Sequence, residues 1–251
     1  MTRMMLARSW TVTSIIRSPR QAASILELGD NLRTAQDTDT LFNRTSATCA
    51  VFAAGSFSNV YSIDRDAAKC TIKARRNPRP RSGIPHDLFP GLALQVVARG
   101  LPRNSYPEIG DARLQADRYL VAMANSRRVR GGPPFQAISL RPTWLTTGRG
   151  TGKVTLGKTR ALGDVSIEDT AAVAVEMLGR EDVSGWFDLL SGDVPVKDAV
   201  EGVVRDKVDC IEGEVVQAIM HWRTRQKNSY SYLGIFTLRT YNEPRALEIS
   251  A

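Results

Sequence analysis

The amino-acid sequence predicts an α/β protein built on a doubly wound, mostly parallel sheet. Stretches typical of strands alternate along the chain with stretches typical of helices. Most of the strand stretches are continuous apolar runs, which indicates strands that are covered on both faces. The 251 residues are 42% hydrophobic and 24% charged, so the chain can form a sizeable core.

The first half of the chain predicts two strand–helix units. Residues 10–17 (WTVTSIIR) and 47–55 (ATCAVFAAG) are apolar, partly β-branched runs bounded by turn residues, and each predicts a buried strand. Residues 20–29 and 63–74 follow these runs and carry apolar residues at helical spacing. The pattern then breaks down from residue 75 to 107, where six prolines fall and LALQVVA at 92–98 is the only strand candidate.

The second half is more regular. Residues 111–129 predict an amphipathic helix, and residues 135–142 (FQAISLRP) predict a strand stopped by proline. In VSIEDTAAVAVEMLGR, Ser166 stands three residues before Asp169, a spacing typical of a helix N-cap. A strand over 185–193 and a helix starting near Pro195 complete the alternation. We therefore predict one domain over 1–216, irregular between 75 and 107, and a loosely attached tail over 217–251.

Composition excludes several classes of protein. No apolar run approaches the roughly 18 residues that span a bilayer, and the N-terminus lacks the apolar stretch of a signal peptide. We expect a cytoplasmic protein that makes no membrane contact. Three cysteines and two histidines are scattered without metal-ligand spacing, so no metal site is predicted.

The net charge of +8 raises the possibility of nucleic-acid binding. Basic residues gather in 73–81 and again around 223–227. No aromatic residues that could stack on bases alternate with these arginines, and basic proline-rich runs most often form solvated loops. Nucleic acid is therefore the less favoured partner class.

GKVTLGKT, at residues 152–159, matches the phosphate-loop pattern G-x-x-x-x-G-K-[ST] at every position. A working phosphate loop needs a buried strand before it and a helix beginning at its Lys-Thr. The preceding TTGRGT cannot form a buried strand, and Gly163 follows too soon for a helix. Val154 and Leu156 alternate with polar residues, which predicts a half-buried strand instead.

Seven segments together resemble one family. WTVTSIIRSP, YSIDRDAAK, ARLQADRYLVAMA, FQAISLRPTWLT, TGKVTLGKT, VSIEDTAAVAVEML and GWFDLLSGD are similar, in this order, to landmarks of the atypical short-chain dehydrogenase/reductases of the NmrA-like, NAD(P)-binding Rossmann type, with fungal sequences most similar. The resemblance is strong from about Asp111 to Glu214. It is good over 6–29 and 51–74, and absent over 75–106 and after Val216.

The resemblance also implies that a first strand and its glycine-rich turn are missing, so that the chain begins inside the first helix. In the family that turn approaches the cofactor pyrophosphate. The first strand lies in the middle of the sheet, so its loss would leave two unpaired edges. Residues 92–98 are one candidate to fill that gap.

Cofactor-binding positions follow from the same resemblance. Arg17 ends the strand that reaches the adenine ribose, where an arginine suits the 2′-phosphate of NADP, although NAD remains possible. Ala53, Ala54 and Gly55 correspond to a small-residue turn under the cofactor, and Pro142 and Thr143 follow a strand that ends beside the nicotinamide. The alternative for Arg17 is a solvent-exposed arginine at the end of a strand. For Ala53–Gly55 it is ordinary tight packing, and for Pro142 and Thr143 it is a plain strand stop.

Catalytic residues cannot be assigned from the sequence. The family often carries a Tyr-x-x-x-Lys pair, in which lysine lowers the pKa of tyrosine for proton transfer. Arg113 matches the lysine position, but Ile109 stands where the tyrosine would be. Tyr106 is two turns away only if the helix extends that far, and Pro107 and Gly110 predict that it does not.

Two functions therefore remain open. One is an NADPH-dependent reductase of a small carbonyl or alkene. The other is a non-catalytic Rossmann remnant that binds a dinucleotide or a partner. The substrate and the oligomeric state cannot be derived from the sequence.

Overall fold

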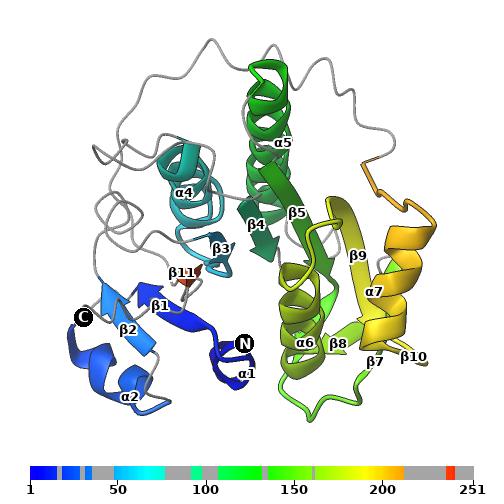
Figure 1. Cartoon of the computed structure of the whole chain (residues 1–251), viewed down its shortest axis with the longest axis horizontal. Coiled ribbons are helices and arrows are strands. Elements are labelled where there is room, and N and C mark those ends of the chain that lie inside the picture. Colours follow the sequence, from blue (N-terminus) through cyan, green and yellow to red (C-terminus); the bar gives the residue numbers. More distant parts are fainter. Residues whose placement is uncertain are drawn as a thin grey trace, which may run out of the picture.

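A mixed sheet forms the centre of the molecule (Figure 1). The structure is a computed structural model that describes residues 1–15, 19–28, 48–76, 107–131, 135–159 and 162–211, and the strands at 32–35, 92–97 and 236–240. Nine described strands make up the sheet. In spatial order they are β10 (Val194–Pro195), β7 (Lys153–Gly157), β9 (Gly185–Ser191), β5 (Phe135–Pro142), β4 (Leu92–Val97), β3 (Cys49–Phe52), β11 (Phe236–Thr240), β1 (Thr11–Ile15) and β2 (Leu32–Ala35).

The predicted parallel arrangement is confirmed for the greater part of this sheet. β1 pairs with β2 in parallel, and β3, β4, β5 and β9 form a continuous parallel set. β7 and β10 add an antiparallel margin beyond β9. Two short strands, β6 (Trp144–Thr146) and β8 (Asp164–Ser166), form a separate parallel pair.

Helices cover both faces of the sheet. The described helices are α1 (Thr2–Ala7), η1 (Pro19–Gln21), α2 (Ala22–Leu26), the π-helical turn η2 (Tyr61–Ala67) that continues into α4 (Ala68–Arg76), α5 (Pro107–Val129), α6 (Ile167–Leu178) and α7 (Val196–Arg205). Side chains alternate across each strand. Ala50 and Phe52 of β3 therefore join the core beneath α4 and α5, whereas Cys49 and Val51 join a core with α1 and α6.

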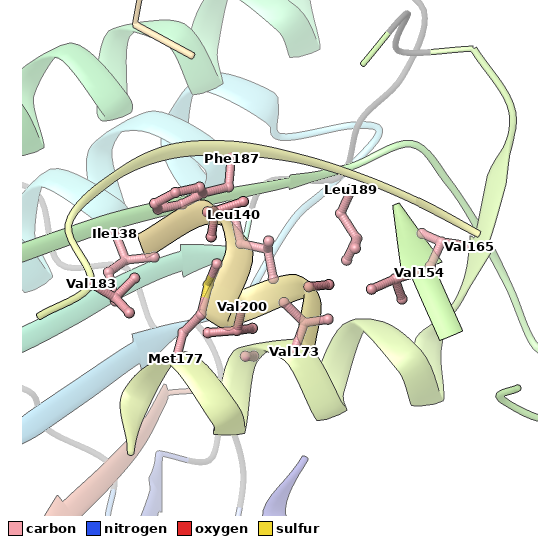
Figure 2. Packing of buried hydrophobic residues seen from close by; sticks show 13 residues of the cluster. Ile138, Leu140, Val154, Val165, Val173, Met177, Val183, Phe187, Leu189 and Val200 are labelled. Carbon is pink, nitrogen blue, oxygen red and sulfur yellow. The ribbon is translucent and has the colours of Figure 1, made fainter. Parts of the chain in front are cut away.

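The largest apolar cluster lies between the sheet and helices α6 and α7. Ile138 and Leu140 of β5 and Phe187 of β9 project toward these helices (Figure 2). Met177 of α6 and Val200 of α7 meet them, and all five side chains are buried. This cluster fixes the β5–β9 half of the sheet.

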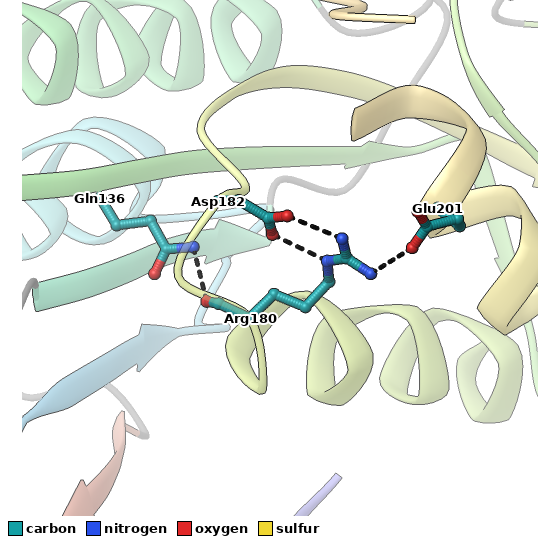
Figure 3. Close-up of polar contacts among 4 residues, drawn as sticks. All are labelled: Gln136, Arg180, Asp182 and Glu201. Carbon is teal, nitrogen blue, oxygen red and sulfur yellow. Dashed lines mark hydrogen bonds and ion pairs between the residues drawn. The ribbon is translucent and has the colours of Figure 1, made fainter. Parts of the chain in front are cut away.

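A polar network secures the turn that connects α6 to β9 (Figure 3). The guanidinium of Arg180 donates to both carboxylate oxygens of Asp182, at 2.8 and 2.7 Å, and to Glu201 of α7 at 2.5 Å. The backbone carbonyl of Arg180 accepts a 2.9 Å hydrogen bond from the Gln136 amide at the start of β5. Three elements are thus connected through one residue.

The position between β1 and β3, called the central slot because strands flank it on both sides, is occupied by a strand that the sequence did not predict. β11 lies between β1 and β3 and runs antiparallel to both (Figure 1). The suggestion that residues 92–98 fill this gap is wrong, because β4 pairs with β3 and β5 on the other side. Residues 217–251 thus contribute a strand to the sheet, although no element was expected there. The domain boundary at residue 216 stays a prediction.

Helix α5 begins earlier than expected. It includes Pro107 and passes through Gly110, so the prediction that these two residues stop the helix is wrong. Proline is well tolerated at the first helical position, because its missing N–H has no helical partner there in any case. Ile109 and Ala112 are buried against Val60, which stabilises this first turn in spite of the glycine.

Candidate functional site

The predicted site residues lie at the edge of the sheet where the parallel strands end. We call it the carboxyl edge, formed by the ends of β1, β3, β4, β5 and β9. β3 ends at Phe52 and leads into Ala53–Gly55, and β5 ends at Pro142 and leads into Thr143. Only β4 separates them, so the two turns stand roughly 10 Å apart across the sheet, or two strand spacings. Ligands of doubly wound folds bind at this edge.

The turn after β3 approaches its neighbours closely at Gly55. A Cβ atom at this position would stand 3.2 Å from Asp64 Oδ1 and 3.5 Å from an Arg113 guanidinium nitrogen. Ala53 and Gly55 are exposed, and Ala54 is half-buried. The backbone N–H of Ser56 donates to Asp64 Oδ2 at 2.9 Å. This small-residue turn therefore presents exposed backbone while its far side is anchored to η2.

A buried ion pair anchors this turn. Arg113 Nε donates to Asp64 Oδ1 at 2.9 Å, and only 11% and 1% of the two side chains is exposed. Asp64 projects from the π-helical turn η2, and Arg113 from α5. Arg113 occupies the position that resembles the family's lysine, but here its guanidinium is bonded to a carboxylate.

Tyr61 is the described tyrosine nearest in sequence to this pair, and its surroundings do not suit proton transfer. Its hydroxyl donates to Asp111 Oδ2 at 3.1 Å, and that hydrogen bond raises the pKa of Tyr61. A catalytic tyrosine needs a neighbouring cation that lowers its pKa. Arg65 stacks over the Tyr61 ring at 4.9 Å, but Asp66 neutralises it. Tyr106 lies outside the described residues.

The turn after β5 is held by hydrogen bonds to the adjacent strand β9. Thr143 is buried, and both its backbone N–H (3.0 Å) and its hydroxyl (3.3 Å) donate to the Leu189 carbonyl. The hydroxyl is therefore used within the sheet, which favours the alternative of a plain strand stop for this side chain. Trp144, the next residue, was interpreted from the sequence as core or pocket wall and not as a site residue, and it is 49% exposed. Arg17 lies outside the described residues, so its role stays a prediction.

Asp64 was missed as a candidate. It forms a pair with a residue 49 positions away, which no local pattern reveals. The one sequence signal was its position one turn after Tyr61, at the start of the predicted helix over 63–74.

The phosphate-loop match is not a phosphate site in this fold. Backbone N–H groups of Thr151 and Gly152 donate to the Asp169 carboxylate at 2.9 and 2.8 Å, and that of Gly150 donates to Glu168 at 2.7 Å. Carboxylates thus occupy the backbone donors at the first glycine of the motif and just upstream of it, and they would repel a phosphate. Residues 153–157 form strand β7, as expected from their alternation.

A hollow of about 440 Å³ lies elsewhere, between the end of β7 and the segment after α7. Leu156, Lys158 and residues 206–209 and 211 line it. No predicted site residue belongs to this lining. We therefore place the candidate site at the carboxyl edge and not in this hollow. None of the described helices has the length and apolar character to cross a bilayer.

Comparison with known proteins gives structural neighbours only. No protein-family model and no curated protein matches the chain. A Bacillus halodurans protein assigned as an NAD-dependent epimerase/dehydratase has a TM-score of 0.58 at 23% identity, over 76% of this chain and 86% of that one. An oxidoreductase from Lactococcus lactis has a TM-score of 0.57 at 12% identity, over 81% and 91%.

A third neighbour is an anaerobilin reductase from Escherichia coli O157:H7, with a TM-score of 0.55 at 16% identity, over 77% of this chain and 90% of that one. At these identities the likeness establishes the fold: the chain has a doubly wound, Rossmann-like α/β fold.

Proposed function

We propose that the chain binds a nicotinamide dinucleotide along the carboxyl edge, NADP in preference to NAD, and acts as a reductase of a small carbonyl or alkene. The main observation in support is the small-residue turn Ala53–Gly55, which is largely exposed. It stands two strands away from Pro142, at the edge of a Rossmann-like sheet where ligands bind. Structural neighbours assigned as an NAD-dependent epimerase/dehydratase, an oxidoreductase and a reductase support the same class.

The chemistry would be hydride transfer from the nicotinamide to the substrate, followed by protonation. This chain would supply binding and orientation, and Arg17 would pair with the 2′-phosphate. A charge-assisted hydrogen bond to phosphate contributes roughly 1.5–3 kcal/mol, which is tenfold or more in affinity. Arg17→Glu should therefore remove the preference for NADPH over NADH.

Calorimetric titration with NADPH and with NADH tests this proposal. We expect wild-type protein to bind NADPH more tightly, and Arg17→Glu to lose that preference while its NADH affinity stays within a few-fold. Arg20→Glu, which changes charge in the same way three residues along the chain, is the matched control. No heat change with either cofactor would refute dinucleotide binding.

A second candidate is a non-catalytic Rossmann module. Two observations favour it. Arg113 is ion-paired with Asp64, and the hydrogen bond to Asp111 raises the pKa of Tyr61 although Arg65 stacks on its ring. β11 runs antiparallel to β1 and β3, so it begins at the carboxyl edge and ends at the opposite edge of the sheet. The end of this strand therefore cannot lead into a helix whose N-terminus binds a pyrophosphate at the carboxyl edge. NADPH binding without NADPH oxidation across a panel of carbonyls and alkenes would select this candidate.

A further inference from the structure

Helices α4 and α5 bring two basic segments of the chain together. α4 ends with Lys73, Arg75 and Arg76, and α5 ends with Arg127 and Arg128, followed by Arg130. The two segments are about 50 residues apart in the sequence, and each alone resembles a solvated loop or helix end. Only the fold makes them neighbours.

The packing of the two helices shows that these ends lie side by side. Ala68 and Ile72 of α4 share one buried cluster with Ala116, Leu120 and Met123 of α5. Both helices run toward the sheet edge where β4 and β5 begin, because each precedes one of these parallel strands. Arg127 follows Met123 by four residues, so it continues the buried stripe of α5 just beyond the apolar cluster.

No acid compensates this charge within the described residues. The sequence has no Asp or Glu between Asp66 and Asp87, and none between Asp117 and Asp164. None of the ion pairs among the described residues includes Lys73, Arg127, Arg128 or Arg130. Burial lowers the pKa of Arg127, and no carboxylate opposes that shift.

Capping of the helix ends does not account for so many cations. Each helix C-terminus carries roughly half a negative charge, so two ends offset about one positive charge. Four basic residues with described side chains, Lys73, Arg127, Arg128 and Arg130, stand on or just beyond these two ends. About three of their positive charges therefore remain for an anionic partner.

We propose that this basic end of α4 and α5 binds the phosphate backbone of a nucleic acid. Lys73, Arg128 and Arg130 are exposed, and they are distributed over two helix ends rather than enclosed in a pocket. That arrangement fits a row of phosphates better than one small anion. Stacking aromatics were not found among the basic segments, so the binding is electrostatic and without sequence preference. The surface lies opposite the carboxyl edge, so the inference is independent of the proposed function.

Fluorescence anisotropy with a labelled DNA duplex of roughly 20 base pairs, at several salt concentrations, tests the inference. The test variant carries Arg127→Gln, Arg128→Gln and Arg130→Gln. The control carries Lys153→Gln, Lys197→Gln and Lys207→Gln, which remove the same charge from exposed positions on other elements. Each lost phosphate contact lowers the slope of log K against log salt by about 0.9, so the test variant should lose about 2.7 in slope and at least tenfold in affinity.

The slope of the control variant should agree with the wild-type slope to within about 0.9, the contribution of one phosphate contact. Absence of salt-dependent binding by the wild-type chain would overturn the inference. Equal losses in both variants would do the same, because binding would then follow net charge and not this surface. If the test variant fails to fold by circular dichroism, Lys73→Gln with Arg130→Gln, both at exposed positions, must show a slope reduced by about 1.8.

Discussion

At the scale of single residues, the pair of Asp64 and Arg113 connects the fold to the candidate site. It ties the turn after β3 to η2 and α5, and a Cβ at residue 55 would stand only 3.2 Å from the Asp64 carboxylate, which would have to shift by a few tenths of an ångström. A buried pair of this kind adds little stability compared with apolar residues, but removing one partner leaves an uncompensated charge. The pair therefore acts as a constraint on the position of Ala53–Gly55.

Asp64→Asn should lower the free energy of unfolding by roughly 3–5 kcal/mol, because the buried guanidinium of Arg113 would lose the carboxylate to which it donates. Urea denaturation measures this loss. Asp66→Asn is the matched control: it removes the same charge from a pair with Arg65 whose side chains are 21% and 23% exposed, and it should cost about 1 kcal/mol or less. Equal losses for the two variants would show that burial does not distinguish the pairs.

At the scale of elements, the N-terminus of α6 holds the loop that mimics a phosphate site. Ser166 caps the helix by accepting from the Asp169 N–H at 2.8 Å, and its hydroxyl donates to the Asp169 carboxylate at 2.9 Å. Ser166→Ala should cost about 1 kcal/mol of unfolding free energy, the typical value for a lost cap. It should also speed hydrogen exchange at Thr151 and Gly152, whose N–H groups bond to the same carboxylate. Unchanged exchange at both amides would contradict this coupling.

The elements that the sequence predicted correctly are those with local signals. The Ser166 cap, the apolar face of α6 and the alternation in β7 were all visible in short windows, and the structure confirms them. Elements defined by distant partners were missed. β11 is only five residues long and becomes a strand because β1 and β3 offer it two edges. The Asp64–Arg113 pair was invisible for the same reason.

At the scale of the whole molecule, the central slot between β1 and β3 decides how far the likeness to other Rossmann-like sheets extends. β1 and β3 are buried along their whole length, so an empty slot between them would expose two apolar strands with unpaired backbone groups. The chain fills this slot with a strand that runs opposite to its neighbours. The sheet is thereby complete, but no strand–turn–helix unit leaves this slot at the carboxyl edge.

Because β11 pairs with two strands of the sheet, we expect it to stabilise the fold. Leu238 pairs with Thr13 on one side and with Ala50 on the other. Leu238→Pro removes a backbone donor in a central strand, so it should lower the free energy of unfolding by roughly 3 kcal/mol or more, in a single cooperative transition of the whole sheet. Leu238→Ile keeps the backbone donor at the same position, so it is the matched control and should cost much less. If Leu238→Pro leaves the urea midpoint unchanged, β11 does not stabilise the sheet, and the chain folds around its central slot by other means.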